Sequence, residues 1–355
     1  MEIPSTCSKF DNAPFYLTGK TRDKYCKAPA IKDAEKLTDL MLFPGSKHNY
    51  IILINKICNA AIQIKLISLK GLKAIKKTRV YVEDNTDTRK LVLKTNKATS
   101  SILFYHEGSM EIRLIKELAL VTRKTYHLQE LCCCLGINEG ITQIKKSIDL
   151  EYIPSLCCIV VSFGTCIGLI PTCKDMPRII HKTDSDQIRN IYYDSTEKLL
   201  LVLGTTSLSL FNIDAQGVTG SRVFNNCFLK MPCRVLGWDT VEGAIVLAQL
   251  TNRGRENFHL MRYCSKGIIL KTSVINKMKN SSYYSKKCKT LFYVDDDCSQ
   301  GKIIRGFPMS NARCDEEECI IEGEKVAVLP QHCCQAKSIM LDIKQGLIFA
   351  RPLHY

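Results

Sequence analysis

Three kinds of side chain in this sequence could do chemistry: clustered acids, histidines and cysteines. The densest acidic runs are residues 295–297 and 315–318. A calcium loop needs alternating oxygen ligands around a turn glycine, and Asp-Asp-Asp-Cys-Ser-Gln-Gly does not supply that form. The seven histidines are scattered, and none has a nearby Ser or Cys arranged for nucleophilic catalysis. We therefore predict solvated acidic loops, no catalytic, metal or cofactor site, and no enzymatic activity.

The 19 cysteines cannot all pair within one chain, because their number is odd. Several stand side by side: Cys132 to Cys134, Cys157 with Cys158, and Cys333 with Cys334. No C-x-x-C occurs, and the cluster at His332 lacks the second cluster that a zinc site needs. We interpret most cysteines as small buried hydrophobic residues in a reducing compartment, with Cys157, Cys158 and Cys288 filling the core.

The charge balance points to acidic partners. Fifty Lys and Arg residues against 35 Asp and Glu give a net charge of +15, which suits nucleic acid, an anionic membrane surface or an acidic protein. The candidate polyanion-binding residues are Lys70, Lys73, Lys76, Lys77, Arg79, Lys286, Lys287 and Lys289. Loops that bring them to one face would fit RNA phosphates or anionic lipid head groups. The alternative is that these Lys and Arg side chains lie on solvated loops and bind nothing.

The N-terminus lacks the basic and apolar regions of a signal peptide, which favours a cytoplasmic or nuclear protein. Residues 152–173 carry no formal charge and are long enough to span a bilayer. Prolines near both ends, internal glycines and a β-branched centre instead favour two buried strands with a turn at Gly164. A single membrane span through 152–173 remains the alternative.

The elements that would position these residues are mostly strands, since apolar runs of four to seven residues alternate with polar or glycine turns. The clearest runs share a register in which the strand resumes five positions after a marker residue. The markers are Ser46, Lys97, Pro154, Asp194, Asp239, Ser285 and Asp342. Such a period of about 40–50 residues in an all-strand chain is typical of a β-propeller.

A single four-stranded unit has two apolar faces and must stack between neighbours to bury them. We therefore predict an all-β fold with a single β-propeller over residues 38–355. Seven markers predict seven blades, with six as the alternative. Residues 1–37 form an N-terminal segment, in which 13–19 is a candidate ring-closing strand before a basic connection.

Two stretches resemble known propeller repeats. Residues 291–295 followed by 302–305 are similar to a YWTD strand and the Ile-x-Arg strand after it, and 103–107 followed by 111–113 are a looser match. The chain thus resembles divergent WD40-like and YWTD-like propellers at the superfamily level. It departs from WD40 repeats at Trp238-Asp239, which we place at the start of a strand rather than at its end. The resemblance implies a propeller and no particular family.

A propeller fold hosts unrelated functions. The expected function is a non-catalytic scaffold that mediates protein–protein interaction within a larger, multi-subunit assembly. One alternative is a basic propeller that binds RNA or another polyanion, such as an anionic membrane surface, through its loops. The second is a single-span membrane protein.

Overall fold

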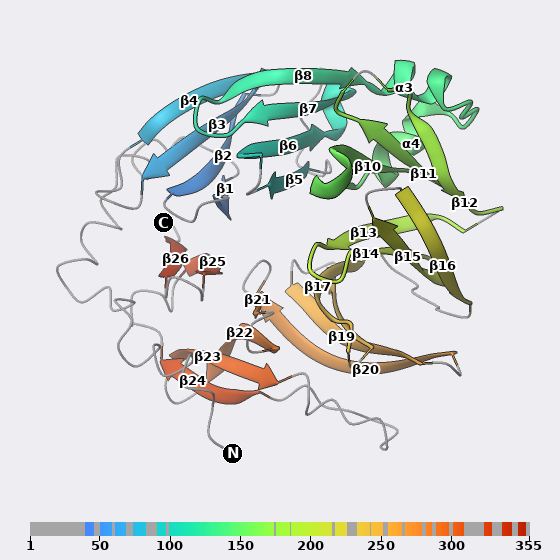
Figure 1. Ribbon diagram of the computed structural model, residues 1–355. Helices are drawn as coiled ribbons and strands as arrows, with labels where there is room; N and C mark the ends of the chain where they lie inside the picture. The colour runs from blue at the N-terminus through green and yellow to red at the C-terminus, as the bar shows by residue number, and fades with distance from the viewer. Residues whose placement is uncertain are drawn as a thin grey trace. The chain divides into compact units, whose positions relative to one another are not determined.

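The computed structural model is built almost wholly from antiparallel strands (Figure 1). It describes residues 40–45, 50–58, 61–68, 74–82, 91–96, 99–173, 175–184, 186–214, 217–225, 233–241, 243–250, 255–264, 267–278, 282–285, 289–297, 301–308, 323–328, 336–342 and 347–352. The predicted all-β class is confirmed. The predicted ring-closing strand and the 1–37 boundary lie outside these ranges.

One compact unit lies within residues 29–230 and contains four sheets of four strands, each ordered as in the sequence. The first sheet has β1 (Leu40–Pro44), β2 (Tyr50–Cys58), β3 (Ala61–Ser68) and β4 (Ala74–Tyr81). The second has β5 (Leu91–Asn96), β6 (Ser101–His106), β7 (Glu111–Lys116) and β8 (Val121–His127). The third has β9 (Leu150–Ile153), β10 (Cys158–Phe163), β11 (Cys166–Pro171) and β12 (Arg178–Lys182). The fourth has β13 (Ile188–Asp194), β14 (Leu199–Gly204), β15 (Ser207–Asp214) and β16 (Gly217–Asn225).

The second compact unit includes residues 231–355. Its first sheet has β17 (Cys233–Asp239), β18 (Ala244–Leu250), β19 (Arg255–Cys264) and β20 (Gly267–Met278). Its next has β21 (Ser282–Ser285), β22 (Thr290–Asp297), β23 (Gly301–Pro308) and β24 (Glu324–Val328), and a pair of strands follows, β25 (Ala336–Asp342) and β26 (Leu347–Pro352). We call the members of each four-stranded sheet its first to fourth strands.

The predicted repeat register is confirmed, because every marker precedes the second strand of a sheet. The turn before that strand also recurs. In five sheets its last residue has a positive φ: Ser100, Cys157, Lys198, Gly243 and Lys289. At the Asp194 marker, the carboxylate oxygen Oδ1 accepts the backbone N–H of Thr196 at 2.8 Å, and Asp239 does the same for Val241 at 3.0 Å. An Asx turn of this kind gives the backbone partners while it reverses.

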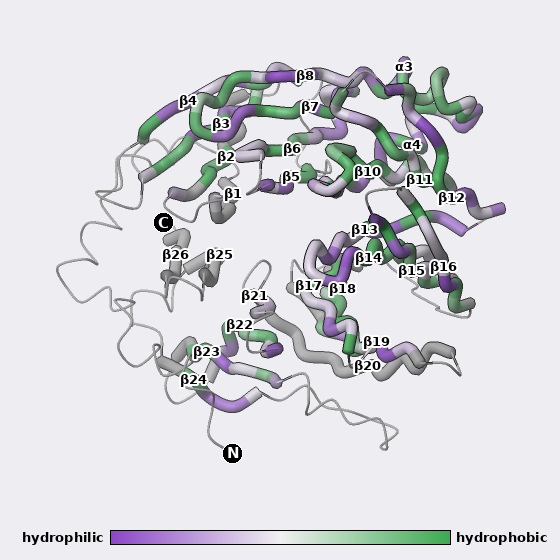
Figure 2. Tube along the Cα trace, in the orientation of Figure 1, coloured by the Kyte–Doolittle hydropathy of each residue, from purple (hydrophilic) through white to green (hydrophobic). Residues whose placement is uncertain are grey.

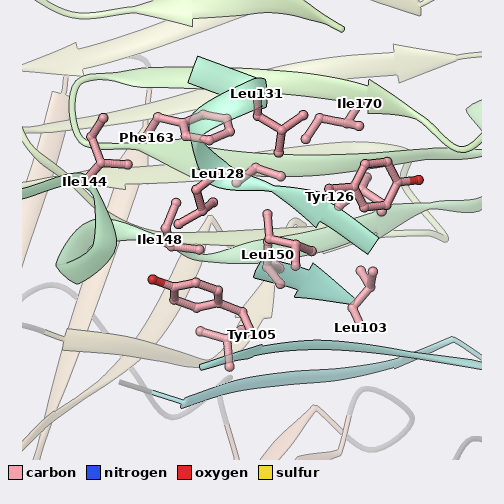
Figure 3. Close-up of a cluster of buried hydrophobic side chains, with 14 of the residues drawn as sticks. Leu103, Tyr105, Tyr126, Leu128, Leu131, Ile144, Ile148, Leu150, Phe163 and Ile170 are labelled. Carbon is pink, nitrogen blue, oxygen red and sulfur yellow. The ribbon is translucent and has the colours of Figure 1, made fainter. Parts of the chain in front are cut away.

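Within each compact unit, the core lies between the faces of consecutive sheets. Ile64 and Val80 of the first sheet pack against Phe104 of the second in one buried cluster. A second cluster joins the second and third sheets and includes Tyr105 of β6 and Phe163 of β10, with Leu150 of β9 between them (Figure 3). Comparable clusters join the third sheet to the fourth and β17–β20 to β21–β24. Figure 2 shows the hydrophobic residues along strands such as β10, with hydrophilic segments on β8 and β12.

Two short helices between β8 and β9 were missed by the strand-based prediction. They are α3 (Leu128–Cys134) and α4 (Ile141–Ser147). Leu128, Leu131 and Ile144 bury their side chains in the cluster between the second and third sheets. The Tyr105 hydroxyl donates to the Lys145 carbonyl at 2.9 Å, which ties α4 to β6.

The uncharged segment 152–173 forms strands. β10 and β11 form an antiparallel hairpin, in which Cys158 lies opposite Pro171 at the open end and Phe163 lies opposite Cys166 at the turn. Gly164, within that turn, has a φ of +65°. The two-strand prediction and its turn are confirmed, and the membrane alternative, which needs a helix here, is wrong. Throughout the described ranges, no helix is long and apolar enough to cross a membrane.

Two further expectations need correction. Of the seven cysteines with described side chains, Cys132, Cys158 and Cys166 are buried, whereas Cys133, Cys134, Cys157 and Cys173 are exposed. The core-filling interpretation is therefore right for Cys158 and wrong for Cys157, whose positive φ places it in the turn; Cys288 lies outside the described residues. Trp238-Asp239 closes β17 instead of opening a strand, because Gly237 interrupts the apolar run that would have marked β17 in the sequence.

Candidate interaction surface

Three of the eight candidate polyanion-binding residues lie together on β4. Lys76, Lys77 and Arg79 are all exposed there. They were expected in a loop, but they lie on a strand, because a fourth strand has exposed positions that tolerate charge. Lys70, Lys73, Lys286 and Lys287 lie outside the described residues.

The fourth strands of five sheets contain no Asp or Glu: β4, β8, β12, β16 and β20. Exposed bases occur on the first four of these: Lys76, Lys77, Arg79, Arg123, Arg178, Lys182 and Arg222. Sequence reasoning chose only the three on β4, since it looked for dense runs. The missing signal was position in the repeat, because the fourth strands β4, β8, β12 and β16 carry exposed bases without dense runs, whereas β24 also carries Glu324.

The same strands expose apolar side chains. Most large hydrophobic residues exposed in the described part of the chain lie on them: Ile75 and Tyr81 on β4, Val121 on β8, Ile179 on β12 and Val223 on β16. Exposed apolar and aromatic groups beside Arg are common in protein interfaces. The fourth strands are thus both basic and partly apolar.

On β4 these residues form a stripe. Lys77, Arg79 and Tyr81 are spaced by two in a regularly paired stretch, so they share one face of the strand, and the exposed Ile75 precedes them at a bulge. Val80 points to the opposite face, where it packs toward the second sheet. Across the strand pair, Lys77 faces Lys65 and Tyr81 faces Ala61, and both β3 residues are buried. The exposed surface therefore begins at β4.

Buried or partly buried charges on or next to the first strands are paired instead. Lys94 on β5 donates from Nζ to Glu151 Oε1 on β9 at 2.5 Å, and their side chains are 31% and 14% exposed. Burial lowers the pKa of Lys94, but the negative charges of Glu151 and Asp149 outweigh it and raise that pKa above 10.5. Burial raises the pKa of Glu151, against the lowering effect of Lys94. Burial and Glu151 raise the pKa of the adjacent Tyr192 to about 12.

Asp149, just before β9, is another paired charge. Its buried carboxylate accepts the backbone N–H of Ile191 at 2.9 Å and the Asn190 amide at 2.5 Å, both on β13. It also accepts the N–H of Leu150 at 3.0 Å. The carboxylate thus fastens the third sheet to the first strand of the fourth.

The last candidate residue, Lys289, belongs with the paired charges. Its Nζ lies 3.1 Å from Asp239 Oδ2, and the Asp239 side chain is only 3% exposed. Lys289 therefore neutralises a buried carboxylate at the end of β17, which its sequence neighbourhood, Lys286 and Lys287, did not reveal. Among the described side chains, no group of three or more His, Cys, Asp or Glu could hold a metal ion.

Comparison with known proteins identifies the fold but no family. No protein-family model and no curated protein matches the chain. The Cps50 (Swd1) β-propeller domain of Myceliophteria thermophila is 9% identical, covering 83% of this chain and 87% of that one, with a TM-score of 0.50. Kuenenia stuttgartiensis hydrazine synthase is 12% identical, and the match covers 89% of this chain and 97% of that one, with a TM-score of 0.53. This chain therefore has a divergent β-propeller fold.

Proposed function

We propose that this chain is a non-catalytic scaffold that mediates protein–protein interaction within a larger assembly. In this proposal, negatively charged partner proteins dock on its fourth strands. The observation that carries it is the composition of β4, β8, β12 and β16, where exposed bases stand beside exposed apolar residues and no acid occurs. Unpaired charge of one sign attracts a partner of the other sign and orients it.

A second candidate function is binding of RNA or another polyanion by the same bases. Phosphate binding releases counterions, so its affinity falls steeply and linearly on a logarithmic salt scale. The exposed Ile75, Val121, Ile179 and Val223 favour a protein partner, because aliphatic side chains gain nothing from a phosphate backbone and gain by burial in an interface.

The test is affinity capture from the source cells with the full chain, followed by identification of the proteins that co-elute. The triple variant Lys76→Glu, Lys77→Glu and Arg79→Glu is compared with a variant that reverses Arg178, Lys182 and Arg222. The proposal expects at least one protein captured by the wild type, retained after nuclease treatment and lost from one of the two variants. If nuclease treatment abolishes capture of the protein, RNA binding is favoured. If both variants capture the same proteins as the wild type, the proposal that partners dock on the fourth strands is wrong.

The absence of catalysis and the cytoplasmic or nuclear location belong to the same proposal. One of the similar structures comes from hydrazine synthase, so the fold alone does not decide between a scaffold and an enzyme. The proposal rests on a surface that offers charge and apolar area, and it needs no cofactor.

A further inference from the structure

β4 differs from the other fourth strands in how its exposed residues are arranged. It carries three exposed bases, more than β8, β12 or β16, and both ends of its exposed stripe are apolar. Ile75 is 50% exposed and Tyr81 is 70% exposed. Lys77 and Arg79 lie between them in the sequence, on the same face as Tyr81. Among the described residues, neither base makes an ion pair.

The backbone of β4 adds a second kind of binding group. β4 is the last strand of its sheet, and no described strand pairs with its outer edge. Such an edge presents a row of backbone N–H and C=O groups that can template another strand. Lysines on an edge usually guard it against pairing, but a guarded edge would not also expose Ile75 and Tyr81.

We propose that the β4 edge binds an extended acidic segment of a partner protein, which adds to the sheet as a fifth strand. The segment would place acids opposite Lys77 and Arg79 and apolar residues opposite Ile75 and Tyr81. Side chains directly opposite each other on paired strands lie about 4.5–5.5 Å apart, close enough for these contacts. Main-chain hydrogen bonds then supply affinity and the alternating side chains supply specificity. This proposal rests on the proposed scaffold function and names the partner chemistry of its best-described surface.

The experiment measures binding of a fluorescent peptide to the full chain by anisotropy. In this peptide Val, Glu, Glu and Tyr occupy every second position, with Thr between them, so that both acids and both apolar residues share one face of the added strand. A second peptide of the same sequence carries N-methyl groups on alternate amides along the edge-facing side, which removes its strand-pairing donors and keeps its charge. We expect the methylated peptide to bind at least about tenfold more weakly, because most strand-addition affinity comes from main-chain hydrogen bonds. Equal binding of the two peptides would show attraction by charge alone and overturn the strand addition.

Matched variants locate the site. Lys77→Glu with Arg79→Glu should weaken the unmethylated peptide about tenfold or more, since both contacts become repulsive. Arg178→Glu with Lys182→Glu changes the net charge equally on β12 and should leave binding within about twofold. If the charge-reversed variant does not fold, the milder variant Lys77→Gln with Arg79→Gln replaces it in the same binding measurement. Equal loss in the β12 variant overturns the assignment to β4.

Single-stranded poly-U RNA provides the competing outcome. The proposal expects poly-U to displace the peptide poorly at physiological salt. Displacement by poly-U at lower concentration than by unlabelled peptide, with the same dependence on Lys77 and Arg79, would make β4 a phosphate surface. Failure of the peptide to bind at all overturns the strand addition. The proposed scaffold function is tested separately from the strand addition. If the peptide fails but cellular capture of a protein still depends on Lys76, Lys77 and Arg79, the strand addition is wrong and the scaffold function stands.

Discussion

First strands and fourth strands of the same sheets carry charge in opposite ways. On the first strands, Lys94 is bonded to Glu151, and the carboxylate of Asp239, at the end of β17, lies against Lys289. On the fourth strands, exposed bases such as Lys77 and Arg79 stand on strands without a single acid. Both regions belong to one repeat, so the difference reflects environment and not sequence background.

Burial explains the first half of this comparison. An unpaired charge away from water costs several kcal/mol, whereas a surface ion pair contributes about 0–1 kcal/mol. The buried charges of the first strands must therefore be paired for the chain to fold. The exposed charges of the fourth strands are under no such requirement, and on β4, β8, β12 and β16 they are all basic. Substituting the buried charges of the first strands should therefore lower the free energy of unfolding, whereas substituting the exposed charges of the fourth strands should weaken binding.

Asp149→Ala should have the largest effect, lowering the free energy of unfolding by about 3 kcal/mol. The substitution removes the acceptor of the buried Ile191 N–H and one acceptor of the Asn190 amide, and a buried donor that loses its acceptor costs about 1–3 kcal/mol. Urea unfolding followed by circular dichroism measures the change. Asp184→Ala, at an exposed aspartate, is the control and should be neutral. A loss below about 1 kcal/mol would contradict the view that first-strand charges are structural.

Much of this architecture was predictable from the sequence, and the pairing of charges was not. Each marker predicted the second strand of a sheet, because Asp or Pro turns followed by apolar runs are local signals. Lys94 and Glu151 are 57 residues apart, so their contact depends on how two sheets pack. The positive φ of Lys198 and Lys289 was equally unpredictable from the sequence, since lysine does not favour that conformation.

The surface was predicted only in part, for a related reason. Dense basic runs led to Lys76, Lys77 and Arg79, which are exposed, and to Lys289, which neutralises Asp239. Density does not distinguish an exposed fourth strand from a turn that packs on a buried carboxylate. Position within the repeat would have done so, because it assigns each residue to a strand before its charge is considered.

Gly237→Ala tests the close packing of first strands and should cost about 2 kcal/mol. A Cβ at Gly237 of β17 would overlap the ring of Tyr284 on β21, and overpacking of this kind typically costs 1–3 kcal/mol. The measurement is again the free energy of unfolding. In a Tyr284→Ala background the methyl group has room, so the further cost should fall toward zero. An undiminished cost there would attribute the effect to the backbone instead of to the contact.

Lys94→Met should lower stability by about 1–2 kcal/mol at neutral pH, because it leaves the mostly buried Glu151 carboxylate without its cation. Without Lys94 the pKa of Glu151, already raised by burial, rises further. A raised acid pKa favours the protonated form in the folded state, so the penalty should shrink as pH falls toward and below 4.5. Adding Glu151→Gln should recover most of the loss. A penalty that stays constant with pH would assign it to lost packing of the lysine stem.

Removing the fourth-strand charges should have the smallest effect on stability. Lys77→Gln with Arg79→Gln is expected to change the free energy of unfolding by less than about 0.5 kcal/mol, as exposed substitutions without partners usually do. Urea unfolding of the variant beside Lys94→Met gives the comparison under identical conditions. A loss near 2 kcal/mol would make these bases structural and remove the distinction between the two kinds of strand. A neutral result, together with weakened binding of the acidic peptide, would show that the bases on β4 contribute to recognition while folding depends on the charges of the first strands.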